Sequence, residues 1–170
     1  MPFTPFHLGP ALLIGVLCLR WLDLPTFLAA SVLVDARTTL VFFGYLDGPL
    51  HGPLHTLLGA TVLAGVLTAA AAPLRPSLDP VLDWAGLPQS TALGRIAAAA
   101  LGGCWLHVLL DATLYTDVFP FAPVSTANPL FGAVGPLTVY VGCVAAGLLG
   151  VGLYAASRVD LLTLADAGSA

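Results

Sequence analysis

The feature that most constrains this chain is a series of five apolar runs, each near the length of a helix that crosses a lipid bilayer. A membrane-spanning helix needs about 20 mostly apolar residues. The runs cover residues 5–22, 24–46, 53–74, 92–115 and 135–157. Only 8% of the residues are charged, whereas a typical soluble domain has about 25%. We therefore expect an all-α fold, a polytopic transmembrane bundle of about five helices in one membrane-embedded domain over residues 1–170.

The connections between the runs contain residues that favour turns and end helices. The shortest, Asp-Leu-Pro, begins at Asp23, and DGPLHGP lies between the second and third runs. Prolines in the two longer connections, PLRPSLDPVLDWAGLPQS and DVFPFAPVSTANP, stop a helix. The second run is unusual because Asp35 and Arg37 lie near its middle. Ionisable side chains at membrane depth are costly and face the bundle interior, so we expect this helix to break near Asp35.

The arginines predict how the bundle is oriented. With five spans, the connections on one side contain Arg20, Arg75, Arg95 and Arg158, and the other connections contain no arginine. Cytoplasmic loops of membrane proteins are enriched in Lys and Arg. We therefore expect a multipass protein of the cell membrane with a cytoplasmic C-terminus and an outward N-terminus. The same topology places all four histidines, together with Asp111, in the outer half of the bundle: His7, His51, His55 and His107.

The remaining polar residues exclude some functions. All five cations are Arg and all nine acids are Asp, and the net charge of −4 comes without a basic patch, so we expect no nucleic-acid partner. Three cysteines, Cys18, Cys104 and Cys143, are scattered through apolar runs without metal-site spacing, which is typical of buried thiols. Four further aspartates are expected to be polar loop residues: Asp23, Asp79, Asp83 and Asp160.

The segment CWLHVLLDATLY carries the strongest chemical signal. His107 and Asp111 are four residues apart on a segment that must be helical in lipid, so they share one face. An imidazole and a carboxylate one turn apart can bind one cation, or the carboxylate can orient an imidazole that binds it. The alternative is a buried His–Asp hydrogen bond that holds two helices together.

The segment HGPLHT adds two more imidazoles. Pro53 suits the first turn of a helix, which places His51 just before the third span and His55 in its first turn. Both can point at one site. The alternative is one loop histidine and one histidine at the membrane interface.

Taken together, these residues predict a metal site. All four histidines and two mid-membrane aspartates can converge on one cavity: His7, Asp35, His51, His55, His107 and Asp111. Nitrogen and oxygen ligands without thiolate suit Zn²⁺, Mn²⁺ or Fe²⁺, and six are enough for one ion or two. Asp117 lies on the same side and is a second-tier candidate.

The ordered set of TPFHLGPALLIG, an Asp in the second helix, HGPLHT and HVLLDAT resembles the membrane-bound metal-dependent hydrolases of the YdjM-like group, from residue 3 to about residue 130. The His-x-x-x-Asp helix is also similar to that of zinc-dependent phospholipase C. The resemblance implies that one or two metal ions, Zn²⁺ by preference, are held by His7, Asp35, His51 or His55, His107 and Asp111. It also implies that a metal-activated water attacks a phosphoester, such as that of a lipid headgroup.

The chain departs from this family pattern at Arg37, where members usually carry a second carboxylate. A guanidinium is a poor metal ligand but can bind a substrate phosphate, so Arg37 is a candidate catalytic residue. The leading hypothesis is a metal-dependent membrane hydrolase acting on a phosphoester or lipid substrate. One alternative is a non-enzymatic membrane protein that binds or transports a metal. Another is a degenerate relative in which an Asp35–Arg37 salt bridge and separated histidines serve only the fold.

Overall fold

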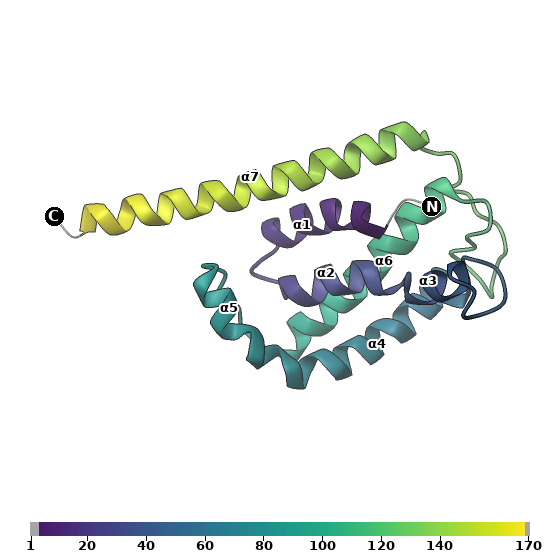
Figure 1. Ribbon diagram of the computed structural model, residues 1–170, viewed down its shortest axis with the longest axis horizontal. Helices are drawn as coiled ribbons and strands as arrows, with labels where there is room; N and C mark the ends of the chain where they lie inside the picture. The colour runs from purple at the N-terminus through teal and green to yellow at the C-terminus, as the bar shows by residue number, and fades with distance from the viewer. Residues whose placement is uncertain (1–3, 169–170) are drawn as a thin grey trace.

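The computed structural model describes residues 4–168, and every regular element in that range is a helix (Figure 1). The elements are η1 (Thr4–His7), α1 (Leu8–Leu17), α2 (Leu24–Leu33), α3 (Ala36–Phe42), η2 (Pro53–His55), α4 (Leu57–Leu74), η3 (Arg75–Leu78), α5 (Asp79–Trp84), α6 (Leu93–Leu114) and α7 (Pro136–Gly168). The expected all-α class is therefore confirmed.

Four helical segments in the described range are long and apolar enough to cross a membrane: Leu24–Phe42, Leu57–Trp84, Leu93–Leu114 and Pro136–Ser157. The first apolar run instead forms a shorter apolar helix, Pro5–Leu17. The connection after α4 is partly helical, because η3 and α5 follow α4 directly and continue the helical segment to Trp84. These four segments indicate a multipass membrane protein.

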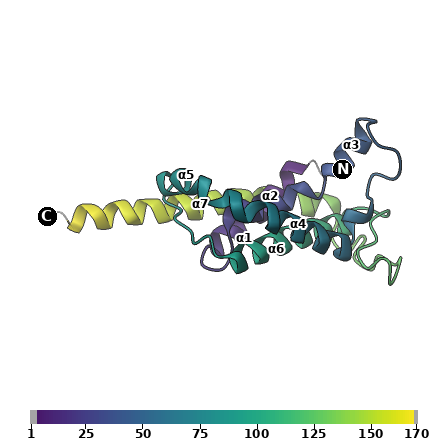
Figure 2. The same ribbon diagram turned by 90° about the horizontal axis from the view of Figure 1, so that it is seen from below.

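Helix α6 lies at the centre of the packing, against α2 on one side and α4 on the other, while α1 lies along α7 (Figure 1). Small side chains permit this close approach. A Cβ atom at Gly9 would collide with the backbone carbonyl of Cys143 in α7, and one at Gly103 would lie 2.5 Å from the carbonyl oxygen of Phe27 in α2. Helix α7 runs on well past α1 toward the C-terminus (Figure 2).

The second apolar run breaks where Asp35 predicts it. Helix α2 ends at Leu33 and α3 begins at Ala36, with Val34 and Asp35 in a turn between them. The Asp35 side chain is buried, with 3% of its surface exposed. A carboxylate at a helix break can turn into the bundle and away from lipid, which places Asp35 where a buried site can use it.

The histidines of HGPLHT are arranged differently from the expectation. His55 does not lie in the first turn of the third span, because Pro53–His55 forms a separate 3₁₀ turn, η2. Thr56 then adopts an extended conformation and caps α4, where its Oγ1 accepts from the Gly59 N–H at 2.9 Å. The turn carries His55 into the protein interior, where it is 1% exposed.

Three of the aspartates expected in polar loops lie elsewhere: Asp23 is fully buried, and Asp79 and Asp83 belong to α5. The side chain of Asp23 caps α2 by accepting from the Thr26 N–H at 3.1 Å and the Thr26 hydroxyl at 2.6 Å. It also forms an ion pair with Nε of Arg75, whose Nη1 donates to Asp79 at 2.7 Å. This network ties the start of α2 to the end of α4.

Arg95 strengthens the same end of the bundle by donating to the carbonyls of Leu19 and Leu22 in the α1–α2 connection. Arg75 and Arg95 thus both contact the connection that contains Arg20. Arg158, the fourth arginine expected on this side, lies outside the residues whose side chains are described.

Candidate metal centre

Four buried side chains converge at the opposite end of α6: Asp35, His55, His107 and Asp111. One ligand atom from each lies within 4.8 Å of the other three. They come from three places, the α2–α3 break, the η2 turn and the last two turns of α6, which the chain brings to the same end of the bundle (Figure 1). All four are among the metal ligands that the sequence predicts.

His107 is oriented by the backbone of α2. Its Nδ1 lies 2.7 Å from the carbonyl oxygen of Ser31, which can only accept, so Nδ1 carries the hydrogen. In the neutral ring, Nε2 then has a free lone pair. This atom lies 3.3 Å from Asp111 Oδ2, 3.4 Å from Asp35 Oδ1 and 3.3 Å from His55 Nε2. Acceptors therefore face one another, and a proton or a cation must lie between them.

The carboxylate of Asp111 lies within 4.0 Å of a ring nitrogen of each of the four histidines. Its Oδ2 lies 3.4 Å from His55 Nε2, in addition to the contact with His107. Its Oδ1 lies 3.2 Å from Nε2 of His7, which is 2% exposed. The His7 ring also stacks on the His107 ring, with centroids 3.9 Å apart and an interplanar angle of 15°. The 3₁₀ turn η1 thus delivers the predicted His7 directly beside the four-residue cluster.

His51 lies at the outer edge of the cluster. Its Nε2 is 4.0 Å from Asp111 Oδ2, and its Nδ1 is 2.8 Å from Asp117 Oδ1. The ring packs against Tyr115, with centroids 4.4 Å apart. The six predicted ligands therefore share one neighbourhood, although His7 and His51 are not part of the closest set of four.

The surroundings favour positive charge at this site. Burial alone would lower the pKa of His55, but hydrogen bonds to Asp111 and Asp35 outweigh it and raise the pKa above its ordinary value. Tyr115 behaves as a neutral group, since burial and the nearby Asp111 charge raise the pKa of its phenol. Two buried carboxylates need compensating charge, and a divalent ion held by these nitrogen and oxygen atoms would supply it.

Arg37, the predicted catalytic residue, supports the loop after α3. Its Nη1 donates to the carbonyl of Pro49 at 2.8 Å, and its guanidinium packs so closely on Gly52 that a Cβ atom there would collide with it. The histidines do not point apart as the degenerate alternative requires; they converge on Asp35 and Asp111. A role for Arg37 toward substrate phosphate stays a prediction.

Sequence reasoning missed two supporting groups. The carbonyl of Ser31 fixes His107, but a backbone acceptor leaves no mark on residue identity. Tyr115 contacts His51 from the residue that follows α6. Asp117 had been singled out only by its side of the membrane, and its partner His51 could not be inferred from spacing because 66 positions separate them.

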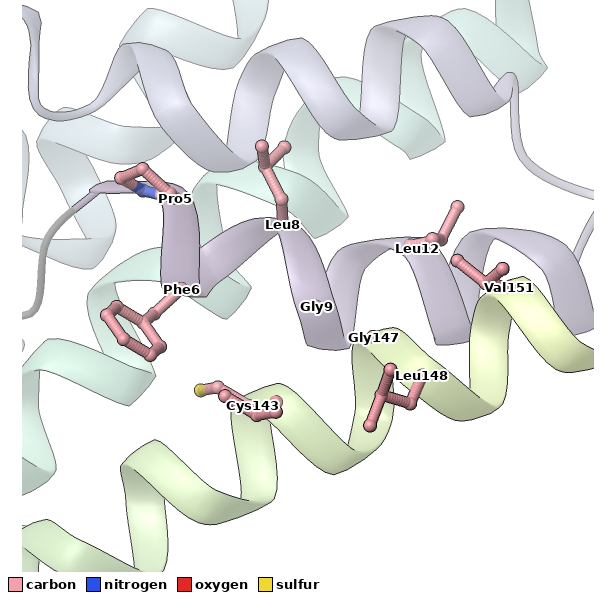
Figure 3. A pocket seen from close by; sticks show the side chains of 10 residues that line it. Pro5, Phe6, Leu8, Gly9, Leu12, Cys143, Gly147, Leu148 and Val151 are labelled. Atoms are coloured by element: carbon pink, nitrogen blue, oxygen red, sulfur yellow. The ribbon is translucent and has the colours of Figure 1, made fainter.

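An apolar groove of about 370 Å³ lies next to this end of the bundle, between α7 and the N-terminal helical turns (Figure 3). Phe6, Leu8 and Leu12 line it on one side, and Leu148 and Val151 line it on the other. Phe6 and Leu8 directly flank His7 in the sequence. The groove therefore reaches the segment that carries one of the cluster histidines.

Comparison with known proteins gives no relative: no protein-family model matches the chain, and searches of curated proteins and of solved structures found no match. The class of protein therefore rests on the structure of the chain alone. It is a helical protein with four apolar helices long enough to span a membrane and a buried His/Asp cluster that could hold a metal ion. The resemblance to membrane-bound metal-dependent hydrolases stays a prediction from the ordered motifs.

Proposed function

We propose that this chain is a multipass membrane hydrolase that binds a divalent metal, Zn²⁺ by preference, and cleaves phosphoester bonds. One observation carries the proposal. In the cluster, the Nε2 of His107, held inward by the Ser31 carbonyl, faces two carboxylates and a second imidazole at 3.3–3.4 Å. Such a convergence of acceptors in an apolar bundle is the arrangement that a metal ion stabilises.

The donor set fits Zn²⁺ in type and number. Imidazole nitrogen and carboxylate oxygen are ordinary zinc ligands, at about 2.0–2.2 Å from the ion. Two ionised carboxylates neutralise a divalent cation, so the loaded centre has no net charge to bury. His107 also has the supporting hydrogen bond that metal-binding histidines usually make through their other nitrogen.

A bound ion would supply Lewis acidity and lower the pKa of water at the site. The protein's own contribution is positional. Asp111 links His7 to the inner ligands through its two oxygens, and the phenol of Tyr115 is a neutral hydrogen-bond donor at the edge. Arg37, if the loop it supports closes on substrate, would offer a guanidinium for bidentate contact with a phosphate.

A lipid phosphoester is the substrate class that the surroundings favour. The groove in Figure 3 has only apolar or glycine residues along its walls, and two of them, Phe6 and Leu8, flank His7 in the sequence. An acyl chain in this groove would bring its headgroup to the end of the bundle that contains the cluster. The arginine-rich opposite end favours, by the positive-inside rule, a site in the outer half of the membrane with the C-terminus in the cytoplasm.

A second function, metal holding without catalysis, has one specific observation in its favour. Catalytic zinc sites usually use three protein ligands and keep one position open, whereas structural sites use four. The closest set here has four members. Hydrolysis therefore requires a coordination number above four, and metal binding or transport does not.

The test begins with elemental analysis of the purified protein and of a His107→Ala/Asp111→Ala double variant. Asp83→Ala, which changes an exposed aspartate in α5, is the matched control. We expect about one or two equivalents of transition metal per chain in the wild type and the control, and loss of metal in the double variant. Absence of metal after reconstitution with Zn²⁺, Mn²⁺ or Fe²⁺ would exclude both functions.

Loaded protein is then assayed in detergent micelles with bis(p-nitrophenyl) phosphate and with mixed phospholipids. Metal-dependent turnover that the double variant lacks supports the hydrolase. Stoichiometric metal without turnover of any of these phosphoesters would favour the metal-holding function instead.

A further inference from the structure

His51 is held by a carboxylate at the protein surface. Its Nδ1 lies 2.8 Å from Asp117 Oδ1, and the Asp117 side chain is 48% exposed while that of His51 is 3% exposed. An ionised carboxylate only accepts, so the His51 Nδ1 carries the hydrogen and donates it. The neutral ring then directs the lone pair of Nε2 toward Asp111, whose Oδ2 is 4.0 Å away.

This arrangement repeats that of His107. Each ring donates from Nδ1 to an oxygen outside the centre and turns Nε2 inward toward Asp111 Oδ2. The two anchors differ, because the Ser31 carbonyl meets His107 in the buried interior whereas Asp117 is half exposed. The pair of histidines therefore has one anchor inside the bundle and one at its surface.

The 4.0 Å gap between His51 Nε2 and Asp111 Oδ2 is compatible with a shared ion. A nitrogen lone pair and a carboxylate oxygen repel each other unless a proton or cation lies between them. Ligands at about 2.0–2.2 Å from one ion are separated by at most about 4.4 Å. The 4.0 Å between His51 Nε2 and Asp111 Oδ2 is within that limit.

We propose that Asp117 is a positioning residue that presents His51 to the metal centre as its outward-facing ligand. The inference rests on the proposed metal site. It adds one nitrogen donor next to Asp111, on the side of the centre that leads to Asp117 and the surface. The competing explanation is that the His51–Asp117 pair only fastens the loop before η2 to the segment after α6.

The experiment uses the full chain in detergent, freed of metal and titrated with Co²⁺. The affinity is measured by competition with a chelator, and the visible absorption of bound Co²⁺ reports the coordination number. The variants are Asp117→Asn, Asp117→Glu, His51→Ala and the double variant His51→Ala/Asp117→Asn. Asp83→Asn is the control for loss of an exposed aspartate.

We expect Asp117→Asn to weaken Co²⁺ binding about 10- to 100-fold, the usual effect of losing a ligand's supporting partner. The Co²⁺ spectrum should shift in the same direction as that of His51→Ala. Asp117→Glu, which keeps the charge, should recover part of the affinity, and Asp83→Asn should bind as the wild type does. In the His51→Ala background, the Asp117→Asn change should cause no further loss.

Two results would contradict the positioning role of Asp117 without contradicting the proposed metal site. One is wild-type affinity and spectrum in Asp117→Asn. The other is an equal loss with and without His51, since Asp117 would then act through another group. If Asp117→Asn fails to fold, the comparison of Asp117→Glu with His51→Ala decides in the same way. If the wild type binds no Co²⁺, Zn²⁺ or Mn²⁺, the proposed function fails together with the inference.

Discussion

The two ends of this bundle both bury charged groups among apolar helices, but they do so in opposite ways. At one end, Asp23 and Asp79 surround the guanidinium of Arg75, a cation that the chain itself provides. At the other, Asp111 lies within 4.0 Å of all four histidine rings, whose nitrogens can accept as well as donate. Arginine stays charged and only donates, so the charges of the first network are paired by the chain's own residues.

The difference indicates what each end is for. A carboxylate–guanidinium network with fixed partners stabilises the junction between α2 and η3. A set of imidazoles and carboxylates can exchange protons for a metal ion, because both kinds of group bind either one. The end that contains Arg75 therefore has a structural role, and the end that contains the histidines is the candidate for ligand binding.

The largest effect on stability should come from the arginine end. Asp23→Ala leaves Arg75 buried without its buried carboxylate, with only the half-exposed Asp79 as partner, and removes the cap from the Thr26 N–H. We expect the free energy of unfolding in detergent to fall by about 3–5 kcal/mol, as when one partner of a buried ion pair is deleted. Metal affinity in the folded fraction should stay at the wild-type value, because the cluster lies at the other end of α6.

Thermal unfolding of the metal-free protein measures this loss, with the exposed-site change Asp83→Ala as the control. Should Asp23→Ala not fold, Thr26→Val removes only the 2.6 Å hydroxyl contact to Asp23. This milder change should cost about 1–3 kcal/mol, because it leaves a buried acceptor short of a donor. A loss below about 0.5 kcal/mol in both variants would contradict a structural role for this network.

The next largest effect should come from Asp111, now on metal affinity and not on the fold. Asp111→Asn keeps the shape of the side chain but removes the charge that four histidines share. We expect metal affinity to fall by at least about 100-fold, which is more than the usual cost of a supporting residue. Chelator competition measures it. Retention of wild-type affinity would mean that the ion is held elsewhere.

The sequence predicted the fold more completely than the site's details. Hydropathy and turn residues located α4, α6 and α7 and the break at Asp35, because each is a local consequence of membrane depth or proline. The six candidate ligands were found because ionisable residues in an apolar chain are few. Local patterns could not show that Asp23 is buried, since its partner Arg75 is 52 positions away. The geometry of HGPLHT also depended on Thr56 adopting an extended conformation, which residue type alone does not determine.

Adding metal should stabilise the folded protein through the histidine end and not through the arginine end. At a free ion concentration of 100 times the dissociation constant, binding adds about 2.7 kcal/mol to the stability of the folded state. We expect Zn²⁺ to raise the thermal midpoint of the wild type and of Thr26→Val equally, and to leave Asp111→Asn unchanged. An equal increase in Asp111→Asn would show that Zn²⁺ acts through sites unrelated to the cluster.

The smallest effect on stability is expected from substitution of Arg37. The same substitution distinguishes a role in supporting the loop from a role in binding substrate. Arg37→Gln removes one hydrogen bond, from Nη1 to the Pro49 carbonyl, at a half-exposed position. The free energy of unfolding should therefore fall by only about 0.5–1.5 kcal/mol, and metal affinity should not change. If the guanidinium binds substrate phosphate, the same variant should raise KM for a phosphoester. Arg37→Lys, which keeps the charge but loses the planar fork, should recover only part of that loss. An unchanged KM in both variants would mean that Arg37 only supports the loop. The histidine end would then differ from the opposite end in using no arginine for binding.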